Sequence, residues 1–110
     1  PLTSRQLKRI LKRTGVGIAR TGGYTGHGSG EVMIGFTTAN RIPSGREEEL
    51  LQISAIPEHV INRAFLAAAE AEQEAILNSM TAAKQTRGRE GELYYSLAEY
   101  LNDREVETSK

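Results

Sequence analysis

Five glycines lie among the nine residues from Gly22 to Gly30, and they divide the chain into two parts that must fold differently. Glycine loses more backbone freedom on folding than any other residue, so this density of glycine disfavours both helix and strand. The stretch is therefore predicted to be a loop. Apolar residues recur at helical intervals before it and alternate after it.

The segment before the loop is predicted to form a helix over residues 4–19 with a single apolar stripe. Thr3 and Gln6 have the spacing of a capping box, which marks a helix start. Gly15 and Gly17 weaken the helix by about 1 kcal/mol each relative to alanine. We interpret these two glycines as positions where another backbone packs closely.

The segment from Glu31 to Ala39 has the period of two that is typical of a strand. Its two faces, both predicted to be covered, would carry Val32, Ile34 and Phe36 on one side and Met33, Gly35 and Thr37 on the other. A long helix is predicted from Pro57 to about Ala83, and a short one over residues 95–101. A lone strand is not stable without neighbours, so these elements do not make a self-sufficient fold.

Charge and composition argue against several classes of function. Fourteen basic residues balance 14 acidic ones, so no overall positive field indicates nucleic acid. Residues 1–20 hold six basic side chains and no acidic one, but no aromatic residue interleaves them, and we interpret them as a solvated helix face. Nucleic-acid binding through this helix stays as an alternative, and we expect none.

Cysteine is absent, which removes disulfides, thiolate nucleophiles and zinc–thiolate sites. No apolar run is long enough to span a membrane, and the start of the chain lacks the pattern of a signal peptide. We therefore expect no membrane contact and a cytoplasmic location.

The glycine stretch also displays three side chains that can carry chemistry, those of His27, Ser29 and Glu31. In an extended segment they would share one face, while the glycines between them let a substrate or a backbone approach. A polar surface loop with no chemistry is the plain alternative. A phosphate cradle requires a helix after the loop, and a strand is predicted there instead. A self-contained Ser-His-Glu triad is geometrically doubtful, because residues on one short extended run point in parallel.

One further alternative starts from Pro1, since an N-terminal proline amine can act as a catalytic base, as in the small tautomerases. In those enzymes the proline begins a strand. Here Pro1 leads within two residues into a helix cap, which argues against that chemistry.

Two blocks of the sequence resemble one known family. "GIARTGGYTGHGSGEVMIGFTTANRIP" (residues 17–43) closely resembles the small C-terminal subunit of the L-aminopeptidase D-amidase/D-esterase family, which includes the β-peptidyl aminopeptidases. "EAILNSMTAAKQTRGREG" (residues 74–91) resembles a second block of that family, and the capped basic helix is also similar. The resemblance covers nearly the whole chain.

The resemblance implies a fold and an activity. The fold would be α+β, part of an αββα sandwich similar in its layers to N-terminal-nucleophile hydrolases but differently connected. Members of the family cut their own chain before a serine, which becomes the nucleophile. They release N-terminal residues from short peptides, amides or esters and use no metal or other cofactor.

The resemblance also implies roles for individual residues. Ser29 and Glu31 would be catalytic, with the Ser29 hydroxyl hydrogen-bonding the nucleophile and the Glu31 carboxylate orienting that network. The resemblance gives His27 no catalytic role, and we expect His27, Gly28 and Gly30 to be residues of the substrate pocket. The implied partners are the larger N-terminal subunit of the same precursor and, in the assembled protein, further copies of the heterodimer.

The resemblance leaves two hypotheses. In the first, residues 1–110 are a single-domain segment of a self-processing serine aminopeptidase that lacks the first strand and the nucleophilic serine, so the segment alone would be inactive. In the second, the chain is a non-enzymatic binding module that keeps half of the sandwich and has lost the chemistry.

Overall fold

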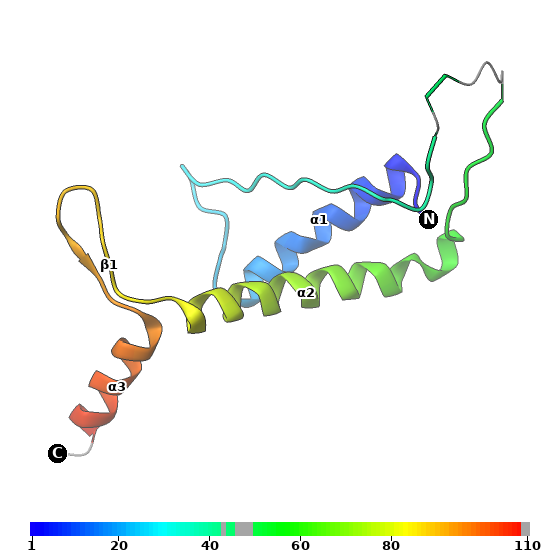
Figure 1. The fold of residues 1–110 in the computed structure, drawn as a ribbon. Helices are drawn as coiled ribbons and strands as arrows, with labels where there is room; N and C mark the ends of the chain where they lie inside the picture. Colours follow the sequence, from blue (N-terminus) through cyan, green and yellow to red (C-terminus); the bar gives the residue numbers. More distant parts are fainter. Residues whose placement is uncertain (43, 46–49, 109–110) are drawn as a thin grey trace. The chain divides into compact units, whose positions relative to one another are not determined.

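The computed structural model describes residues 1–42, 44–45 and 50–108 (Figure 1). In chain order its elements are helix α1 (Ser4–Arg20), the 3₁₀ turn η1 (Glu58–Val60), helix α2 (Ile61–Ala82), strands β1 (Thr86–Arg87) and β2 (Leu93–Tyr94), and helix α3 (Leu97–Thr108). They fall into two compact units, Pro1–Gln73 and Glu74–Lys110. This mixture of helices with a small sheet is compatible with the predicted α+β class. The assignment of residues 1–110 to one domain segment stays a prediction.

Helix α1 begins where the sequence predicts it to begin. The Thr3 hydroxyl accepts from the Gln6 backbone N–H at 3.2 Å, and the Gln6 side chain accepts from the Thr3 backbone N–H at 3.1 Å. This reciprocal pair satisfies two backbone donors that a helix end otherwise leaves without partners. Gln6 is itself buried and donates from Nε2 to the Ile56 carbonyl at 2.7 Å, so the cap also ties α1 to the chain before η1.

The long helix starts later than predicted. Pro57 precedes the 3₁₀ turn η1 rather than opening α2, and α2 begins at Ile61. A 3₁₀ turn is a common way for a chain to enter an α-helix, and proline fits before it because its missing N–H would have no partner there.

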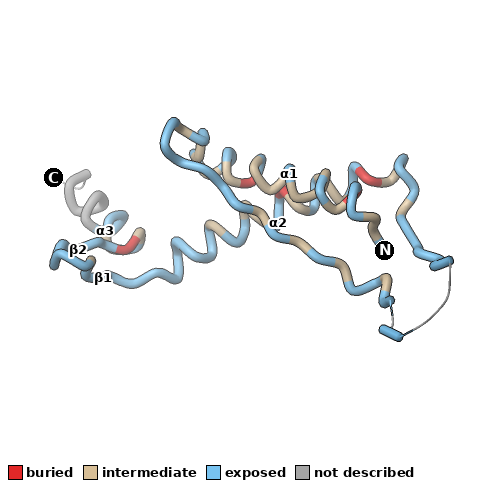
Figure 2. Tube along the Cα trace, turned by 90° about the horizontal axis from the view of Figure 1, so that it is seen from above, coloured by how far each residue is buried: buried red, intermediate tan, exposed pale blue. Residues whose placement is uncertain are grey.

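In the first unit, α1 and α2 lie close together at Gly17. A Cβ at this position would lie 2.5 Å from the Ala69 carbonyl oxygen and 2.7 Å from the Glu72 Cβ. Gly17 and Ala69 are both buried (Figure 2). The predicted close packing at Gly17 is confirmed, whereas an added Cβ at Gly15 would meet only the Met33 side chain, at an ordinary 3.6 Å.

The basic side chains of α1 are not uniformly solvated. Arg5 donates to the Glu58 carboxylate at 2.6 Å, and Arg9 donates to its other oxygen. The guanidinium groups of Arg9 and Arg13 lie over the Phe65 ring, with centroid distances of 5.3 and 4.1 Å. Arg20 also donates to the Gln73 side chain at 3.4 Å, so four of the six basic residues contact η1 or α2. Arg5 and Arg20 are nevertheless exposed, as the solvated-face interpretation predicts, whereas it is wrong for Arg9 and Arg13, which are half-buried.

The predicted strand at residues 31–39 is not paired with another strand in the described part of the chain. The backbone runs beside α1 (cyan in Figure 1), and its alternation is as predicted. Gly35 lies against Leu11 and Met33 against Gly15, while Val32, Ile34 and Phe36 are 91, 88 and 83% exposed. In the part of the chain that the structure describes, α1 lies against one face of the segment and the other face is exposed, so the prediction that both faces are covered is wrong there.

The second unit contains a hairpin that the sequence analysis treated only as a break between helices. β1 and β2 pair antiparallel, with Thr86 opposite Tyr94 and Arg87 opposite Leu93. The turn between them closes with a hydrogen bond from the Gly91 N–H to the Gly88 carbonyl at 3.1 Å, and Gly91 has a φ of 89°. Glycine is the residue that adopts this φ without strain.

Helix α3 follows the hairpin and extends further than the predicted 95–101. The Ser96 hydroxyl accepts from the Glu99 backbone N–H at 3.2 Å, and the Glu99 carboxylate accepts from the Ser96 backbone N–H at 2.8 Å. These reciprocal bonds form a second capping box, for which Ser96 and Glu99 have the expected spacing. The same bonds lower the pKa of Glu99, chiefly through the Ser96 backbone donor.

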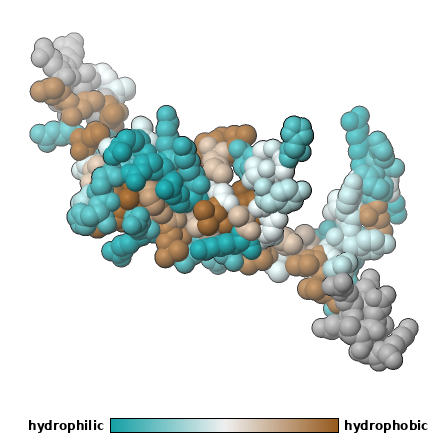
Figure 3. Space-filling model, turned by 180° about the vertical axis from the view of Figure 1, so that it is seen from behind, coloured by the Kyte–Doolittle hydropathy of each residue, from teal (hydrophilic) through white to brown (hydrophobic). Residues whose placement is uncertain are grey.

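Few side chains of the described residues are buried. Among the residues whose burial the structure describes, Ile61 and Ala69 are the only buried hydrophobic side chains, and other hydrophobic side chains lie open between hydrophilic ones (Figure 3). In the same part of the chain, no helix combines the length and apolar character needed to cross a membrane.

Candidate active site

The glycine loop contains one tight turn, at Gly26–Ser29. The Ser29 backbone N–H and the Ser29 hydroxyl both donate to the Gly26 carbonyl, each at 3.0 Å. Gly28, at the third position of the turn, has a φ of 91°. A positive φ at this position is the feature of a type II turn that favours glycine. The turn therefore explains why the residue between His27 and Ser29 is a glycine.

This turn corrects the expectation that His27, Ser29 and Glu31 share the face of one extended run. The chain reverses between His27 and Ser29, because the i to i+3 hydrogen bond brings the ends of the turn together. The three side chains nevertheless line one cavity of about 400 Å³, formed by residues 22–29 and Glu31. The loop thus gathers the predicted residues around a hollow.

Two glycines predicted for the pocket have different places. Gly28 lines the cavity, and its conformation is required by the turn. Gly30 does not line it, and an added Cβ at Gly30 would meet no atom within 4 Å. The roles of His27, Gly28 and Gly30 as substrate-pocket residues stay predictions.

The hydrogen bond from the Ser29 hydroxyl determines whether this hydroxyl donates or accepts a further hydrogen bond. A serine hydroxyl has one proton to donate and two lone pairs that accept. Because the proton is directed to the Gly26 carbonyl, the Ser29 oxygen is left as an acceptor for another hydroxyl. This arrangement suits a residue that receives a hydrogen bond from a nucleophile.

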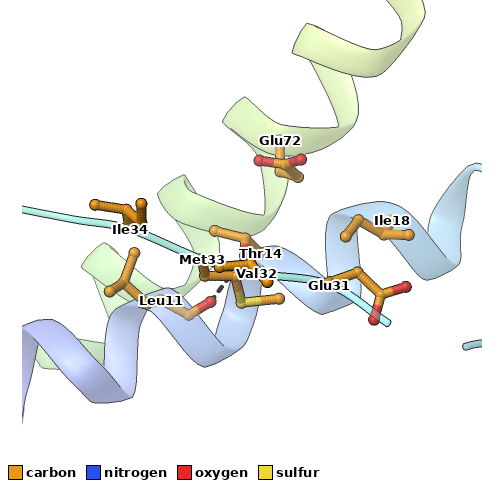
Figure 4. Close-up of a pocket in the computed structure, with 8 residues that line it drawn as sticks. All are labelled: Leu11, Thr14, Ile18, Glu31, Val32, Met33, Ile34 and Glu72. Carbon is orange, nitrogen blue, oxygen red and sulfur yellow. Dashed lines mark hydrogen bonds between the residues drawn. The ribbon is translucent and has the colours of Figure 1, made fainter. Parts of the chain in front are cut away.

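Glu31 lines two cavities. Besides the loop cavity, it lines a second cavity of about 390 Å³ between the extended segment and the helices. Figure 4 shows the residues around this second cavity, which are Leu11, Thr14, Ile18, Glu31, Val32, Met33, Ile34 and Glu72. The Glu31 carboxylate is exposed and has no hydrogen-bond partner in the described part of the chain, so it is available to a group brought by another chain segment or a substrate.

The sequence analysis missed two residues of this loop. Thr25 has a φ of 53°, a left-handed conformation that is unusual for a β-branched residue. Tyr24 places its ring edge and hydroxyl 3.0–3.3 Å from the position of a Cβ on Gly26. No sequence signal indicates the conformation of Thr25, but a single tyrosine among glycines could have been noticed as a wall for the pocket.

The described residues hold no cluster of three or more histidine, cysteine or acidic side chains placed to bind a metal ion. His27, Ser29 and Glu31 offer an imidazole, a hydroxyl and a carboxylate at the loop cavity, and the catalytic roles of Ser29 and Glu31 stay predictions.

Comparison with known proteins assigns the family. The family model described as "Peptidase family S58" matches residues 1–94, which is most of the chain. The chain belongs to peptidase family S58. The resemblance drawn from residues 17–43 and 74–91 is thereby confirmed. The S58 match ends at β2, and α3 lies beyond it.

Relatives of this S58 chain include two curated proteins and one solved structure. The chain is 33% identical over 91 residues to the β-peptidyl aminopeptidase BapA of Sphingosinicella microcystinivorans, a match covering 83% of the chain and 23% of the relative. It is 30% identical over 98 residues to the β-peptidyl aminopeptidase BapA of Sphingosinicella xenopeptidilytica, covering 88% and 24%. The crystal structure of the PH0078 protein from Pyrococcus horikoshii OT3 superposes with a TM-score of 0.84 at 47% identity, covering 94% of the chain and 29% of that protein.

The S58 chain spans about a quarter of the length of the curated relatives that it matches. Its fold agrees with a solved structure over nearly its whole length. It is therefore a segment of a peptidase-family protein.

Proposed function

We propose that this S58 segment is part of a self-processing serine aminopeptidase that releases N-terminal residues from short peptides, amides or esters. The observation that carries the proposal is the loop cavity, where Ser29 and Glu31 come together in a chain of this family. Two relatives are named β-peptidyl aminopeptidases, which supports an acyl-transfer reaction on an amino-terminal residue.

In this proposal Ser29 and Glu31 assist a nucleophile that another part of the protein supplies, an N-terminal serine created by self-cleavage. The nucleophilic hydroxyl donates to the Ser29 oxygen, whose own proton is held by the Gly26 carbonyl. The Glu31 carboxylate orients this network and balances positive charge that develops beside it. A hydroxyl nucleophile needs such a neighbour within hydrogen-bond reach, itself oriented by a third group.

The larger subunit of the same precursor is the proposed partner, and the proposed fold is one half of an αββα sandwich. The exposed face of Val32, Ile34 and Phe36 supports this arrangement. Complete burial of each of these side chains contributes roughly 1.5–3 kcal/mol of favourable free energy. The segment is also unpaired with another strand in the described chain, so its backbone can add to a sheet. Assembly of several such heterodimers is part of the same proposal.

The experiment uses the complete protein and an aminoacyl p-nitroanilide as the substrate. Ser29→Ala removes the acceptor and should lower kcat by about 10²-fold or more, the usual scale of general acid–base assistance. Glu31→Gln keeps the shape of the side chain and removes its charge, so it should slow both turnover and self-cleavage. Ser79→Ala, at an exposed serine of α2, is the control and should leave both rates unchanged.

The double variant Ser29→Ala/Glu31→Gln should cost little more than the slower single variant, because residues that act as one unit are not additive. Near-normal rates in both single variants would remove this loop from the active site. Wild-type protein with no hydrolytic activity and no self-cleavage would instead support the alternative, a binding module without chemistry.

A further inference from the structure

Tyr24 is the single tyrosine of the glycine loop, and although it is 88% exposed, its ring lies against Gly26. Its Cε2, Cζ and hydroxyl atoms lie 3.0, 3.3 and 3.2 Å from the position of a Cβ on Gly26. The ring therefore covers the side of Gly26 where any other residue would carry its side chain. Gly26 has no positive φ, so the ring rather than the backbone conformation explains the glycine.

The residue between them supports this contact. Thr25, which joins the two residues, adopts a φ of 53°, and the Tyr24 ring lies over Gly26. Left-handed conformations of β-branched residues are strained and persist only where the surroundings determine them. The unfavourable backbone conformation of Thr25 therefore occurs between the Tyr24 ring and the glycine that the ring covers.

Gly26 in turn holds Ser29. Its carbonyl oxygen accepts both the backbone N–H and the hydroxyl of Ser29, each at 3.0 Å. A displacement of the Gly26 peptide would move this oxygen and allow the Ser29 proton to turn toward other acceptors. Contacts therefore lead from the Tyr24 ring to Gly26 and from the Gly26 carbonyl to the Ser29 hydroxyl.

We propose that Tyr24 is a positioning residue that acts through Gly26. It keeps the O–H bond of Ser29 pointing away from the nucleophile, so that the lone pairs of the Ser29 oxygen are directed toward the nucleophile. This proposal rests on the proposed function of Ser29. Nothing in it requires the Tyr24 hydroxyl to react, because the ring atoms alone cover Gly26. It predicts an effect on turnover rather than on substrate affinity.

The main test compares two variants of Tyr24 in the complete protein, with an aminoacyl p-nitroanilide as the substrate. Tyr24→Phe keeps the ring and should keep kcat within about threefold of wild type. Tyr24→Ala removes the ring and should lower kcat roughly tenfold or more with KM little changed, because small displacements of a catalytic group are costly. The rate of self-cleavage should fall in the same order.

Gly26→Ala provides an independent route to the same change. Its new Cβ would lie 3.0 Å from the Tyr24 ring and shift the ring, so Gly26→Ala should lower kcat in the same direction as Tyr24→Ala but by less. In the Tyr24→Ala background the same Cβ meets no ring, and adding Gly26→Ala should cost nothing further. Equal melting temperatures of all variants would separate positioning from unfolding.

Two outcomes would overturn the proposal while leaving the proposed function intact. Tyr24→Ala with wild-type kcat would show that the ring does not position Ser29. A raised KM with unchanged kcat would show that Tyr24 contacts the substrate directly. If wild type is active and Ser29→Ala is also fully active, then the assignment of Ser29 fails first, and the role of Tyr24 fails with it.

Discussion

A single carboxylate, that of Glu58, joins α1 to the start of α2. It accepts from Arg5 and Arg9 and from the Gln6 Nε2, which lies 3.1 Å away. These bonds hold the pKa of Glu58 below its usual value, with the Arg9 hydrogen bond the largest cause and the Gln6 bond the next. All three donors lie on one face of α1. Their bonds to the Glu58 side chain therefore hold α1 in place relative to the turn that precedes α2.

The lowered pKa of Glu58 leads to a prediction for the pH dependence of stability. A carboxylate with a lower pKa in the folded state stabilises that state above its unfolded pKa of about 4.3. The stabilisation disappears as the pH falls through the lower folded value. In the complete protein, Glu58→Gln should therefore reduce the melting temperature at about pH 7, and the difference from wild type should shrink as the pH falls below the unfolded pKa and vanish in acid below the folded one.

This prediction is checked by thermal melts of both proteins across that pH range. Glu70→Gln, at an exposed carboxylate of α2, is a suitable control and should behave as wild type throughout. A difference between Glu58→Gln and wild type that is independent of pH would show that shape rather than charge matters at this position.

At the scale of elements, the crossing of α1 over α2 depends on the absence of a side chain at Gly17. Alanine would favour the helix by about 1 kcal/mol, but its Cβ would lie 2.5 Å from the Ala69 carbonyl oxygen. Relief of such a clash requires the two helices to separate, which costs roughly 1–3 kcal/mol as in other overpacked interiors. The clash is the larger effect.

Gly17→Ala should therefore destabilise the complete protein by about 1–2 kcal/mol, whereas Gly15→Ala should be neutral or stabilising by up to about 1 kcal/mol. Gly15 is the matched control because it lies in the same helix and an added Cβ there meets only Met33, at 3.6 Å. Unfolding in denaturant measures both variants. Equal stability of the two would show that the helices do not meet at Gly17.

The start of α3 offers a prediction for the second unit. Ser96 is buried, and its hydroxyl and backbone N–H both bond with Glu99. Ser96→Ala should cost about 1 kcal/mol, the usual value of an N-cap, and it should increase hydrogen exchange at the first amides of α3. Ser79→Ala, in the interior of α2, is the control. Unchanged exchange in α3 would show that the cap does not limit the opening of this helix.

At the scale of the whole molecule, the described chain has apolar side chains but little interior in which to bury them. Only Ile61 and Ala69 are buried among the apolar residues that the structure describes, while the face of Val32, Ile34 and Phe36 is exposed. A chain that leaves these side chains in water loses much of the hydrophobic free energy that offsets the entropy of folding. The rest of the proposed precursor would supply the missing contacts.

The isolated 110-residue polypeptide should therefore unfold over a broad range, without a sharp cooperative transition, and should not hydrolyse an aminoacyl p-nitroanilide above the buffer rate. Calorimetry and a p-nitroaniline assay test the two statements, with the complete protein as the positive control. A sharp transition in the monomeric polypeptide would contradict the first statement, and hydrolysis by it would contradict the second.

The elements whose hydrogen bonds are local could be predicted from the amino-acid sequence alone. The capping box of Thr3 and Gln6 and the apolar stripe behind it predicted α1 to within a residue, because each bond of a helix joins residues four apart. The glycine-rich stretch was predicted as a loop, and the alternation of residues 32–37 was predicted correctly, since both depend on neighbouring residues. The spacing of Ser96 and Glu99 carried the same kind of local signal and was overlooked.

Which surfaces of these elements meet could not be predicted from the sequence. The sequence predicted a covered strand at residues 31–39, but a strand exists only when a second backbone lies beside it, and the described chain does not supply one. The Gly17 crossing was anticipated, but its partner on α2 could not be named from the sequence. In the loop, the positions of Tyr24, Gly26 and Ser29 follow from a turn and a strained Thr25. Such contacts depend on the dihedral angles of several residues at once, and residue types alone do not specify them.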